Sequence, residues 1–379
     1  MTLERLLARP LEGHLVVSLE QAVAAPTCSV RLADAGARVI KIERAEGDFA
    51  RGYDRAVKGG SAYFVWLNRG KESVVLDLKD PADLALMRRM IAKADVFIQN
   101  LAPGAAGRLG LGSAELRQAH SRLVTVDISG YGESGPYAQR KAYDLLVQAE
   151  SGLAFVTGRP EGPGRVGVSV CDIATGLYAY QGVLEALVAR GRTGEGRGLQ
   201  VSLFDAMAEW MSVPYLQTVY GGKQPQRVGL AHPSIAPYGV FPAADGEVLI
   251  SIQNEREWRR LCAEVLAEPA LAEDPRFADS SARVANRAAL DARVAAGFRR
   301  FALAELTERL TAADIAFGLV NDVHGLARHP HLRLVPVVTP EGRIETIASP
   351  LRTVGLEPAY GPVPALGEHS EAVRREFAA

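Results

Sequence analysis

The first half of the chain alternates short apolar runs with stretches of helical periodicity. The apolar runs predict β-strands at 14–20, 38–44, 73–78, 95–100 and 123–129. Apolar residues at helical spacing predict helices between them, for example at 26–37 and 81–94. This alternation predicts an α/β fold with a doubly wound parallel sheet, in which ligands bind at the carboxyl ends of the strands.

The stretch "VGVSVCDIATG", residues 166–176, combines an apolar run with the start of a helix. We expect a short strand that ends at Cys171 and Asp172, followed by a helix over 173–191. Asp is a favoured N-cap, so capping is the simplest role for Asp172, and a carboxylate nucleophile or base is the functional alternative. Cys171 has no histidine near it in sequence and is expected to be a small buried residue.

The pattern changes in the second half of the chain. A hairpin is predicted at 238–252 around Asp245-Gly246, and helices are predicted near 255–266, 281–300 and 303–313. We therefore expect a smaller α+β domain at 222–327, inserted into a large domain formed by 1–221 and 328–379.

Composition narrows the class of protein further. The 379 residues include 43 Lys and Arg and 44 Asp and Glu, a net charge of −1, so nothing indicates nucleic acid or a membrane surface as a partner. The three cysteines lie far apart and predict neither a disulfide framework nor a zinc site. The charged N-terminus lacks the apolar core of a signal peptide, and no apolar run reaches the ~18 residues that span a bilayer. We expect a cytoplasmic protein that binds no metal.

Three further features favour a structural interpretation over a cofactor site. The sequence "GYGESG" at 130–135 matches G-x-G-x-x-G, but Pro136 follows at once and no helix opens on the glycines. A glycine-rich turn beside a ligand is the preferred interpretation. His232 lies in a Pro-rich loop and is expected to be solvated. The histidines at 324, 329 and 331 have no acidic or Cys partner and are expected at the surface.

Basic residues recur at or just beyond the predicted strand ends. Each alone is an ordinary exposed charge, but together they are suited to surround an anionic ligand at the carboxyl edge of the sheet. These residues are Arg44, Lys71, Lys79, Arg108 and Lys141.

Eight stretches in a fixed order resemble the family III CoA-transferases, and the resemblance covers essentially the whole chain. They are "AAPTCSVRLADAGARVIKIER", "YFVWLNRGKESVVLDLKDP", "ADVFIQNLAPGAAGRLGLG", "ISGYGESGPYAQRKAYDLLVQAESGL", "VGVSVCDIATGLYA", "GRGLQVSLFDA", "HPSIAPYGVF" and "LGEHSEAV". Each stretch alone is only a weak match to the family, but the occurrence of all eight in the same order makes the resemblance specific.

The resemblance implies a Rossmann-like large domain built from both chain ends, a smaller inserted domain, and a homodimer of interlocked subunits. It also implies that Asp172 is catalytic. The carboxylate would attack an acyl-CoA thioester, form a mixed anhydride and then an aspartyl-CoA thioester, and pass CoA to an acceptor acid. The substrates would be acyl-CoA and a small carboxylic acid, with no permanently bound cofactor.

The same resemblance transfers binding positions to this chain. Those expected to contact CoA are Ala24, Ala25, Arg44, Leu76, Lys79, Asn100, Leu101, Arg108 and Lys141. Those expected in the substrate pocket are Tyr143, Gly130, Gly132 and His232. Three further basic residues are available for the distal carboxylate of a dicarboxylic acid, namely Arg51, Arg55 and Lys58.

Departures from the family pattern bear on the substrate. Val23 stands where formyl-CoA transferase has glutamine, and "HPSIAPYG" replaces its glycine-run loop, which argues against oxalate or formate. The related α-methylacyl-CoA racemase uses a histidine where this chain has Tyr143, a poor base near neutrality. A CoA-binding protein without activity is the alternative of another class. We expect succinyl-CoA as the donor and a dicarboxylic acid such as itaconate, mesaconate or citramalate as the acceptor.

Overall fold

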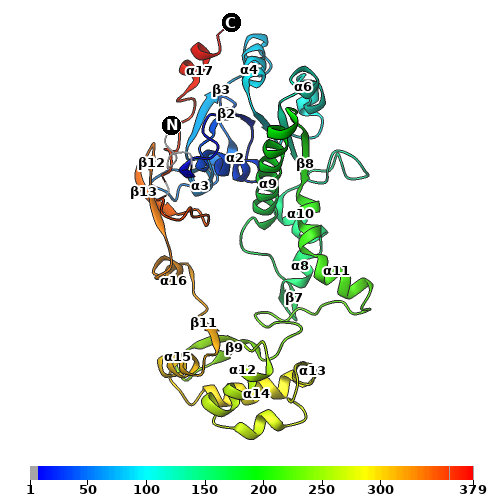
Figure 1. Ribbon diagram of the computed structural model, residues 1–379, viewed down its shortest axis with the longest axis vertical. Helices are drawn as coiled ribbons and strands as arrows, with labels where there is room; N and C mark the ends of the chain where they lie inside the picture. The colour runs from blue at the N-terminus through cyan, green and yellow to red at the C-terminus, as the bar shows by residue number, and fades with distance from the viewer. Residues whose placement is uncertain (1–6, 358, 379) are drawn as a thin grey trace. The chain divides into compact units, whose positions relative to one another are not determined.

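The computed structural model describes residues 7–357 and 359–378. The chain divides into two compact units (Figure 1). Within the described residues, the large unit extends to Ala154, includes Arg165–Tyr215 and resumes at Arg333, and the small unit comprises Phe155–Gly164 and Leu216–Leu332. The small domain expected at 222–327 lies inside the small unit, which begins earlier in the sequence.

A six-stranded parallel sheet forms the centre of the large unit, in the order β3-β2-β1-β4-β5-β8. The strands are β1 (Leu15–Leu19), β2 (Arg38–Glu43), β3 (Lys71–Val75), β4 (Val96–Gln99), β5 (Val124–Ser129) and β8 (Gly198–Ser202). The predicted α/β fold with a parallel sheet is therefore confirmed. Chain order reverses between β1 and β4, and a crevice for ligands is expected at the carboxyl ends of these two strands.

Helices cover both faces of this sheet (Figure 1), because successive strand residues point to opposite sides. Val16 packs in one core with α2 (Ala24–Asp34) and α9 (Val170–Thr193), and Val17 packs in the other core with α4 (Pro81–Lys93). Burial on both faces explains why the strands show continuous apolar runs in the sequence. Further helices of the large unit are η1 (Phe49–Gly52), α3 (Ala62–Asn68), α5 (Ala105–Arg108), α6 (Ser113–Ala119), α7 (Asp144–Glu150) and α10 (Leu203–Trp210).

Helices α2 and α9 approach each other closely at Gly176. A Cβ atom at this position would lie 2.4 Å from the Ala24 carbonyl oxygen and 2.5 Å from Cβ of Thr27. Only a glycine allows this spacing, which holds the first turns of α9 against the start of α2.

The C-terminal segment returns to the edge of the sheet at β3. The backbone N–H groups of Ser73 and Val75 donate to the side chains of His369 (3.3 Å) and Ser370 (3.0 Å). Helix α17 (Ser370–Glu376) contributes Val373 to the core beside β3. The large unit also contains a hairpin of β12 (Leu334–Thr339) and β13 (Gly342–Ile347). Residues from the end of the chain therefore complete the edge of a sheet built by its beginning.

The small unit contains a three-stranded antiparallel sheet of β9 (Tyr238–Pro242), β10 (Glu247–Ser251) and β11 (Ala316–Gly318). The predicted hairpin is confirmed, since β9 pairs with β10 and the Ala243 N–H donates to the Gly246 carbonyl at 2.8 Å. Its helices include α12 (Glu255–Arg260), continued by a π-helical turn at Leu261–Val265, η3 (Pro269–Glu273), α13 (Ser280–Ala285), α14 (Arg287–Phe298), α15 (Leu303–Ala312) and α16 (Val323–Ala327). Short strands β6 (Gly158–Arg159) and β7 (Gly162–Pro163) also belong to it.

The strand predicted from the apolar run at 166–170 is wrong, because α9 begins at Val170 and the residues before it form no strand. The Val166 N–H donates to Oε1 of Gln148 at 2.9 Å, and the Val166 carbonyl accepts from Nε2 of the same side chain at 3.4 Å. A buried glutamine from α7 thus takes the hydrogen bonds that a neighbouring strand would have made. Across the described residues, no helix is both long and apolar enough to cross a membrane.

Candidate active site

A cleft of about 630 Å³ lies in the large unit at the carboxyl ends of β1, β4 and β5. Segments 21–24 and 100–103 line it after β1 and β4, and 128–130 lines it at the end of β5. Residues 140–145 and the first turn of α9 complete the wall. This is the position between β1 and β4 that the reversal of chain order predicts for a ligand.

Asp172 lines this cleft from the first turn of α9 and is half-buried. The expectation that Asp172 caps the helix is wrong, because it is the third helical residue and the residue before the helix is Ser169. Asp144 makes the capping contact instead: its Oδ1 accepts from the Cys171 N–H at 2.8 Å. Its Oδ2 accepts from Gln148 at 2.8 Å, which fixes the carboxylate in place. Asp172 is therefore free of a structural task at the helix end.

The pKa of Asp172 is raised to about 7, first by burial and then by the negative charge of Asp144. No hydrogen bond or ion pair to its carboxylate is found within the part of the chain that the structure describes. A half-buried carboxylate without hydrogen bonds or an ion pair is destabilised as an anion. Formation of a covalent bond removes its charge and lowers its free energy. The group is accordingly suited to act as a nucleophile.

Cys171, the neighbour of Asp172, is fully buried. Its thiol donates to the Asp144 carbonyl at 3.4 Å, and burial followed by the charge of Asp144 raises its pKa well above the usual range. Because the thiolate is the reactive form of cysteine, these surroundings support the prediction that Cys171 is a packing residue.

Three aromatic side chains that the sequence analysis did not predict also line the cleft. The ring centres of Phe49 and Tyr53 are 5.6 Å apart, and those of Tyr53 and Tyr63 are 5.3 Å apart. The pKa of Tyr53 is raised to about 12 by burial and by the charges of Asp48 and Asp172, so its hydroxyl stays protonated. Sequence reasoning missed this group, because aromatic residues in η1, in the turn after it and in α3 carry no spacing that links them to Asp172.

Several of the residues that were expected to contact CoA or the substrate line the same cleft as Asp172. They are Ala24, Asn100, Leu101, Gly130, Lys141 and Tyr143. The side chain of Asn100 accepts from the Gln21 N–H at 3.0 Å and donates to the Gln21 carbonyl at 2.9 Å. This pair of bonds joins the loop after β4 to the loop after β1, on either side of the crevice.

Other expected residues lie outside the cleft. Arg44, Lys79 and Arg108 are exposed at or beyond the ends of β2, β3 and α5, and their contacts with CoA stay predictions. Ala25 and Leu76 are buried, with Leu76 in the core beside α4. These two side chains pack inside the protein, so any contact with CoA would involve their backbone.

His232 belongs to the small unit, where its ring stacks on Tyr238 with 5.2 Å between centres. Its Nδ1 accepts from the Ser234 N–H at 3.1 Å, and its carbonyl accepts from Arg287 at 2.6 Å. The histidine thus shapes its own loop, and its role in a substrate pocket stays a prediction.

One of the basic residues expected to surround an anion does not do so. Lys71 is buried at the amino end of β3, where Nζ lies 2.6 Å from Oε1 of Glu20. The expectation is wrong because Lys71 begins its strand, away from the carboxyl edge. Lys41 bonds Asp48 at 2.8 Å in the same buried network, and Asp48 Oδ1 accepts from the Ala22 N–H at 3.1 Å. The network supports the loop after β1 from beneath.

The basic residues that were expected to bind a distal carboxylate lie outside the cleft, and two of them bond to other groups of the protein. Arg51 forms an ion pair with Glu43 at 2.7 Å and stacks on Phe64, with the guanidinium carbon 3.7 Å from the ring centre. Lys58 donates to the Arg343 carbonyl at 2.8 Å. Neither these two side chains nor Arg55 lines the cleft, so the structure does not bring them to Asp172.

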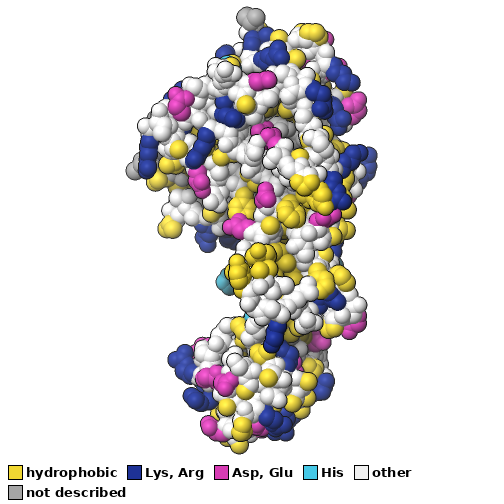
Figure 2. Space-filling view, turned by 90° about the vertical axis from the view of Figure 1, so that its right-hand side faces the viewer, with side chains coloured by type: hydrophobic (Ala, Val, Ile, Leu, Met, Phe, Trp, Pro, Cys, Tyr) yellow, Lys and Arg dark blue, Asp and Glu magenta, His cyan; other side chains and the backbone are white. Residues whose placement is uncertain are grey.

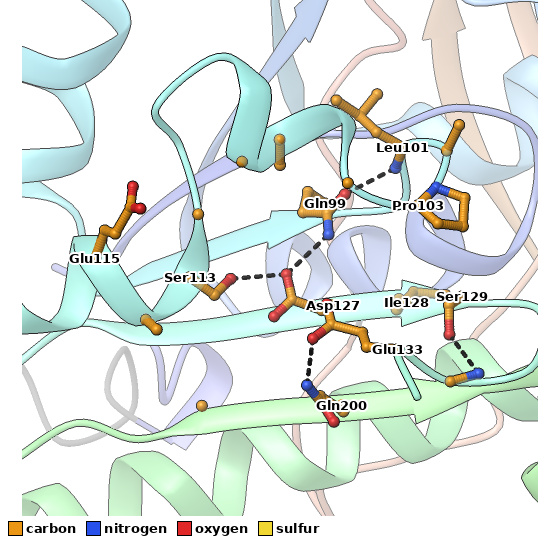
Figure 3. A pocket seen from close by; sticks show the side chains of 18 of the residues that line it. Gln99, Leu101, Pro103, Ser113, Glu115, Asp127, Ile128, Ser129, Glu133 and Gln200 are labelled. Carbon is orange, nitrogen blue, oxygen red and sulfur yellow. Dashed lines mark hydrogen bonds between the residues drawn. The ribbon is translucent and has the colours of Figure 1, made fainter. Parts of the chain in front are cut away.

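A second cavity, of about 590 Å³, opens beside the first at the ends of β4, β5 and β8 (Figure 3). There Asp127 accepts from Gln99 at 2.8 Å and from Ser113 at 2.7 Å, and Gln200 donates to Glu133. Gly132 lines this cavity, and its N–H donates to Ser129 Oγ at 2.9 Å. The segment "GYGESG" is therefore a turn between the cavities, and the next helix, α7, begins only at Asp144.

An unpaired carboxylate on a helix at the sheet's switch point is suited to covalent acyl transfer. The chain belongs to CoA-transferase family III, whose sequence model matches residues 11–370. It is 38% identical to an acetyl-CoA:oxalate CoA-transferase of Acetobacter aceti, covering 98% of this chain and 96% of that protein. It is 34% identical to a succinate–glutarate CoA-transferase of Agrobacterium fabrum, covering 97% and 96%.

A solved structure supports the same conclusion. The crystal structure of a CAIB/BAIF family protein from Brucella suis aligns with a TM-score of 0.85 and 34% identity, covering 98% of this chain and 100% of that one. The predicted resemblance to the family is confirmed. The protein is a CoA-transferase that uses acyl-CoA and a carboxylate as its substrates.

Proposed function

We propose that this enzyme moves CoA from succinyl-CoA to a short dicarboxylic acid, with Asp172 as the covalent carrier. The observation that carries the proposal is the half-buried, unpaired carboxylate of Asp172 in the cleft between β1 and β4. Both relatives described above are named for dicarboxylic acids, oxalate in one case and succinate and glutarate in the other. The similarity to the oxalate enzyme runs against the expectation, drawn from Val23 and "HPSIAPYG", that oxalate is not a substrate, so oxalate is kept among the acids to be tested. Itaconate and mesaconate belong to the same chemical class and are our expected acceptors.

The reaction begins when an Asp172 oxygen attacks the thioester carbonyl. A C–O bond forms, the C–S bond breaks, and CoA leaves as a thiolate. The thiolate then attacks the Asp172 carbonyl of the mixed anhydride, which releases the donor acid as a carboxylate and leaves an aspartyl-CoA thioester. The acceptor carboxylate repeats both steps in the reverse sense, so that the new acyl-CoA departs and the Asp172 carboxylate is restored without net proton transfer.

Each tetrahedral intermediate places negative charge on an oxygen in the cleft. The neutral hydroxyl of Tyr53 and the backbone around Gly130 are the donors that we propose for these oxyanions. The basic residues Lys141, Arg44, Lys79 and Arg108 are proposed to hold the phosphates of CoA, since they lie at or beyond strand ends.

The proposal includes a homodimer. In the large unit, the hydrophobic side chains exposed along α10 and the start of α11 (Ser212–Val219) include Trp210, Val213 and Tyr215, and hydrophobic side chains are seen on the face shown in Figure 2. Neighbouring exposed apolar side chains of this kind are typical of a surface covered in an assembly. Sedimentation at micromolar protein concentration tests it, and a monomer would contradict the dimer.

Mass spectrometry of the acyl-CoA products tests the activity. Succinyl-CoA is incubated with oxalate, glutarate, itaconate or mesaconate, and the intact protein is examined for covalently bound CoA. We expect a new acyl-CoA and a CoA adduct on the wild-type protein, both lost in Asp172→Ala while CoA still binds. Cys171→Ala is the matched control and keeps most of its activity, because its thiol is buried.

Two results would contradict the proposal. Exchange with monocarboxylic acids alone would exclude dicarboxylic acids as the natural substrates. Uptake of deuterium from D₂O into a chiral 2-methylacyl-CoA, without any acceptor acid, would indicate the racemase that shares this fold.

A further inference from the structure

Arg165 lines the same cleft as Asp172, from the short segment that precedes α9. Its side chain is exposed and belongs to the large unit. Within the described residues, Arg165 forms no hydrogen bond, ion pair or ring contact. A guanidinium with five donors and no partner in a substrate cleft is positioned for an anionic ligand.

The other cations of the cleft have different surroundings. Arg140 donates to Glu150 at 3.0 Å, and its guanidinium carbon lies 4.3 Å from the centre of the Tyr137 ring. Lys141 carries a compact ammonium, which binds a phosphate as a point charge. An ammonium does not offer the two parallel hydrogen bonds with which a guanidinium holds a carboxylate. Among the three cations that line the cleft, Arg165 therefore combines a guanidinium, which can hold a carboxylate by two hydrogen bonds, with the absence of a partner among the described residues.

The backbone next to Arg165 is fixed relative to Asp172. Val166 is bound through its N–H and its carbonyl to the Gln148 side chain, at 2.9 Å and 3.4 Å. Gln148 is completely buried and donates to Asp144, which in turn accepts from the N–H of Cys171. One hydrogen-bonded chain therefore sets the base of the Arg165 side chain and the helix turn that carries Asp172.

Within the described residues, Arg165 forms no ion pair with Asp172. The groups that change the pKa of Asp172 are its buried surroundings and Asp144, and no cation is among them. A cation in direct contact would pair with the carboxylate and reduce its reactivity. Arg165 and Asp172 therefore line one cleft without forming an ion pair with each other.

We propose that Arg165 binds the distal carboxylate of a dicarboxylic acid while its other carboxyl group is joined to Asp172 or to CoA. This inference rests on the proposed function and assigns its substrate class to one residue. Two parallel N–H···O bonds from the guanidinium recognise a carboxylate, and an acid without the distal group gains nothing from them. Arg165 is then the residue that separates dicarboxylic from monocarboxylic acids.

Exchange kinetics with pairs of acids of equal chain length test the proposal. Acetyl-CoA serves as the donor, so that only the acceptor carries a distal charge, and glutarate is compared with valerate. In Arg165→Gln, we expect kcat/KM for glutarate to fall 10- to 100-fold, mainly through KM, with the value for valerate unchanged. Arg165→Lys should restore part of the loss. Arg192→Gln, an exposed arginine near the opposite end of α9, is the control and should change neither value.

The outcomes separate this inference from the function on which it rests. Equal losses for glutarate and valerate would show a structural or CoA-binding role and would overturn the inference alone. An unchanged preference for glutarate in Arg165→Gln would overturn it as well. A wild-type enzyme that transfers CoA to no acid, with acetyl-CoA or succinyl-CoA as the donor, would overturn the proposed function itself.

Discussion

The Oδ1 atom of Asp144 accepts a hydrogen bond at 2.8 Å from the backbone N–H of Cys171, the residue before Asp172. This contact caps α9 from outside the helix. It also places a second negative charge near Asp172 and contributes to the rise of its pKa. A single side chain thus stabilises the helix that carries Asp172 and raises the energy of the Asp172 anion.

The activity should fall in acid as Asp172 becomes protonated. Because the carboxylate is the reactive form and its pKa is about 7, kcat/KM should drop about tenfold per pH unit below pH 7 and level off above it. In Asp144→Asn, the midpoint of this decline should move to lower pH, since a negative charge has been removed. Rates measured from pH 5 to 9 check both expectations, and an unmoved midpoint would contradict the role of Asp144.

Replacing Asp172 by Asn should stabilise the protein at high pH. The folded-state pKa of Asp172 lies above its unfolded value, so the wild type loses stability as pH rises from about 4 to about 7. We expect Asp172→Asn to exceed the wild type by roughly 1–3 kcal/mol above pH 7, an amount reduced by the partial exposure of the group. Denaturation by urea at pH 8 and pH 4 measures the difference. The gain should vanish at pH 4, and a constant gain would exclude a charge effect.

The cysteines of the native protein should resist alkylation. Cys28, Cys171 and Cys262 are buried, and burial raises the pKa of all three thiols, that of Cys262 to about 12. Iodoacetamide at pH 8 should therefore modify them only after unfolding. Rapid labelling of Cys171 in the folded protein, with loss of activity, would contradict its assignment as a packing residue.

Two glycines of α9 should respond oppositely to alanine. At Gly176 the new Cβ would meet the Ala24 carbonyl at 2.4 Å, so Gly176→Ala should push α2 and α9 apart and cost about 1–3 kcal/mol or more. At Gly191 no atom lies within 4 Å of an added Cβ, so Gly191→Ala should stabilise the helix by roughly 0.5–1 kcal/mol. Thermal unfolding of both variants checks the contrast. Equal effects would show that the contact between α2 and α9 is loose.

The strands of the sheet were predictable because their apolar runs are long and bounded by turns. The run at 166–170 was misleading, since apolar residues alone do not reveal that Gln148 takes the hydrogen bonds of Val166. Lys71 was misplaced for a similar reason. A lysine beside a strand is normally exposed, and only the fold reveals Glu20 buried 2.6 Å from its ammonium.

The resemblance to the family implied a catalytic role for Asp172, whereas the spacing alone favoured capping of a helix. What the sequence could not supply is the choice among basic residues. Arg51 appeared available for a distal carboxylate, whereas Arg165, closer to Asp172 along the chain, was not singled out. The difference arises from Glu43 and Phe64, which hold Arg51 elsewhere.

The C-terminal segment that covers β3 has a consequence for biosynthesis. Ser73 and Val75 bond to His369 and Ser370, which leave the ribosome almost 300 residues later. Until then the edge of the nascent sheet has open hydrogen-bonding groups and lacks the apolar cover of Val373. Folding of the large unit is therefore complete only after His369, Ser370 and helix α17 have left the ribosome, and a chain truncated before them would expose an unpaired strand edge to aggregation and proteolysis.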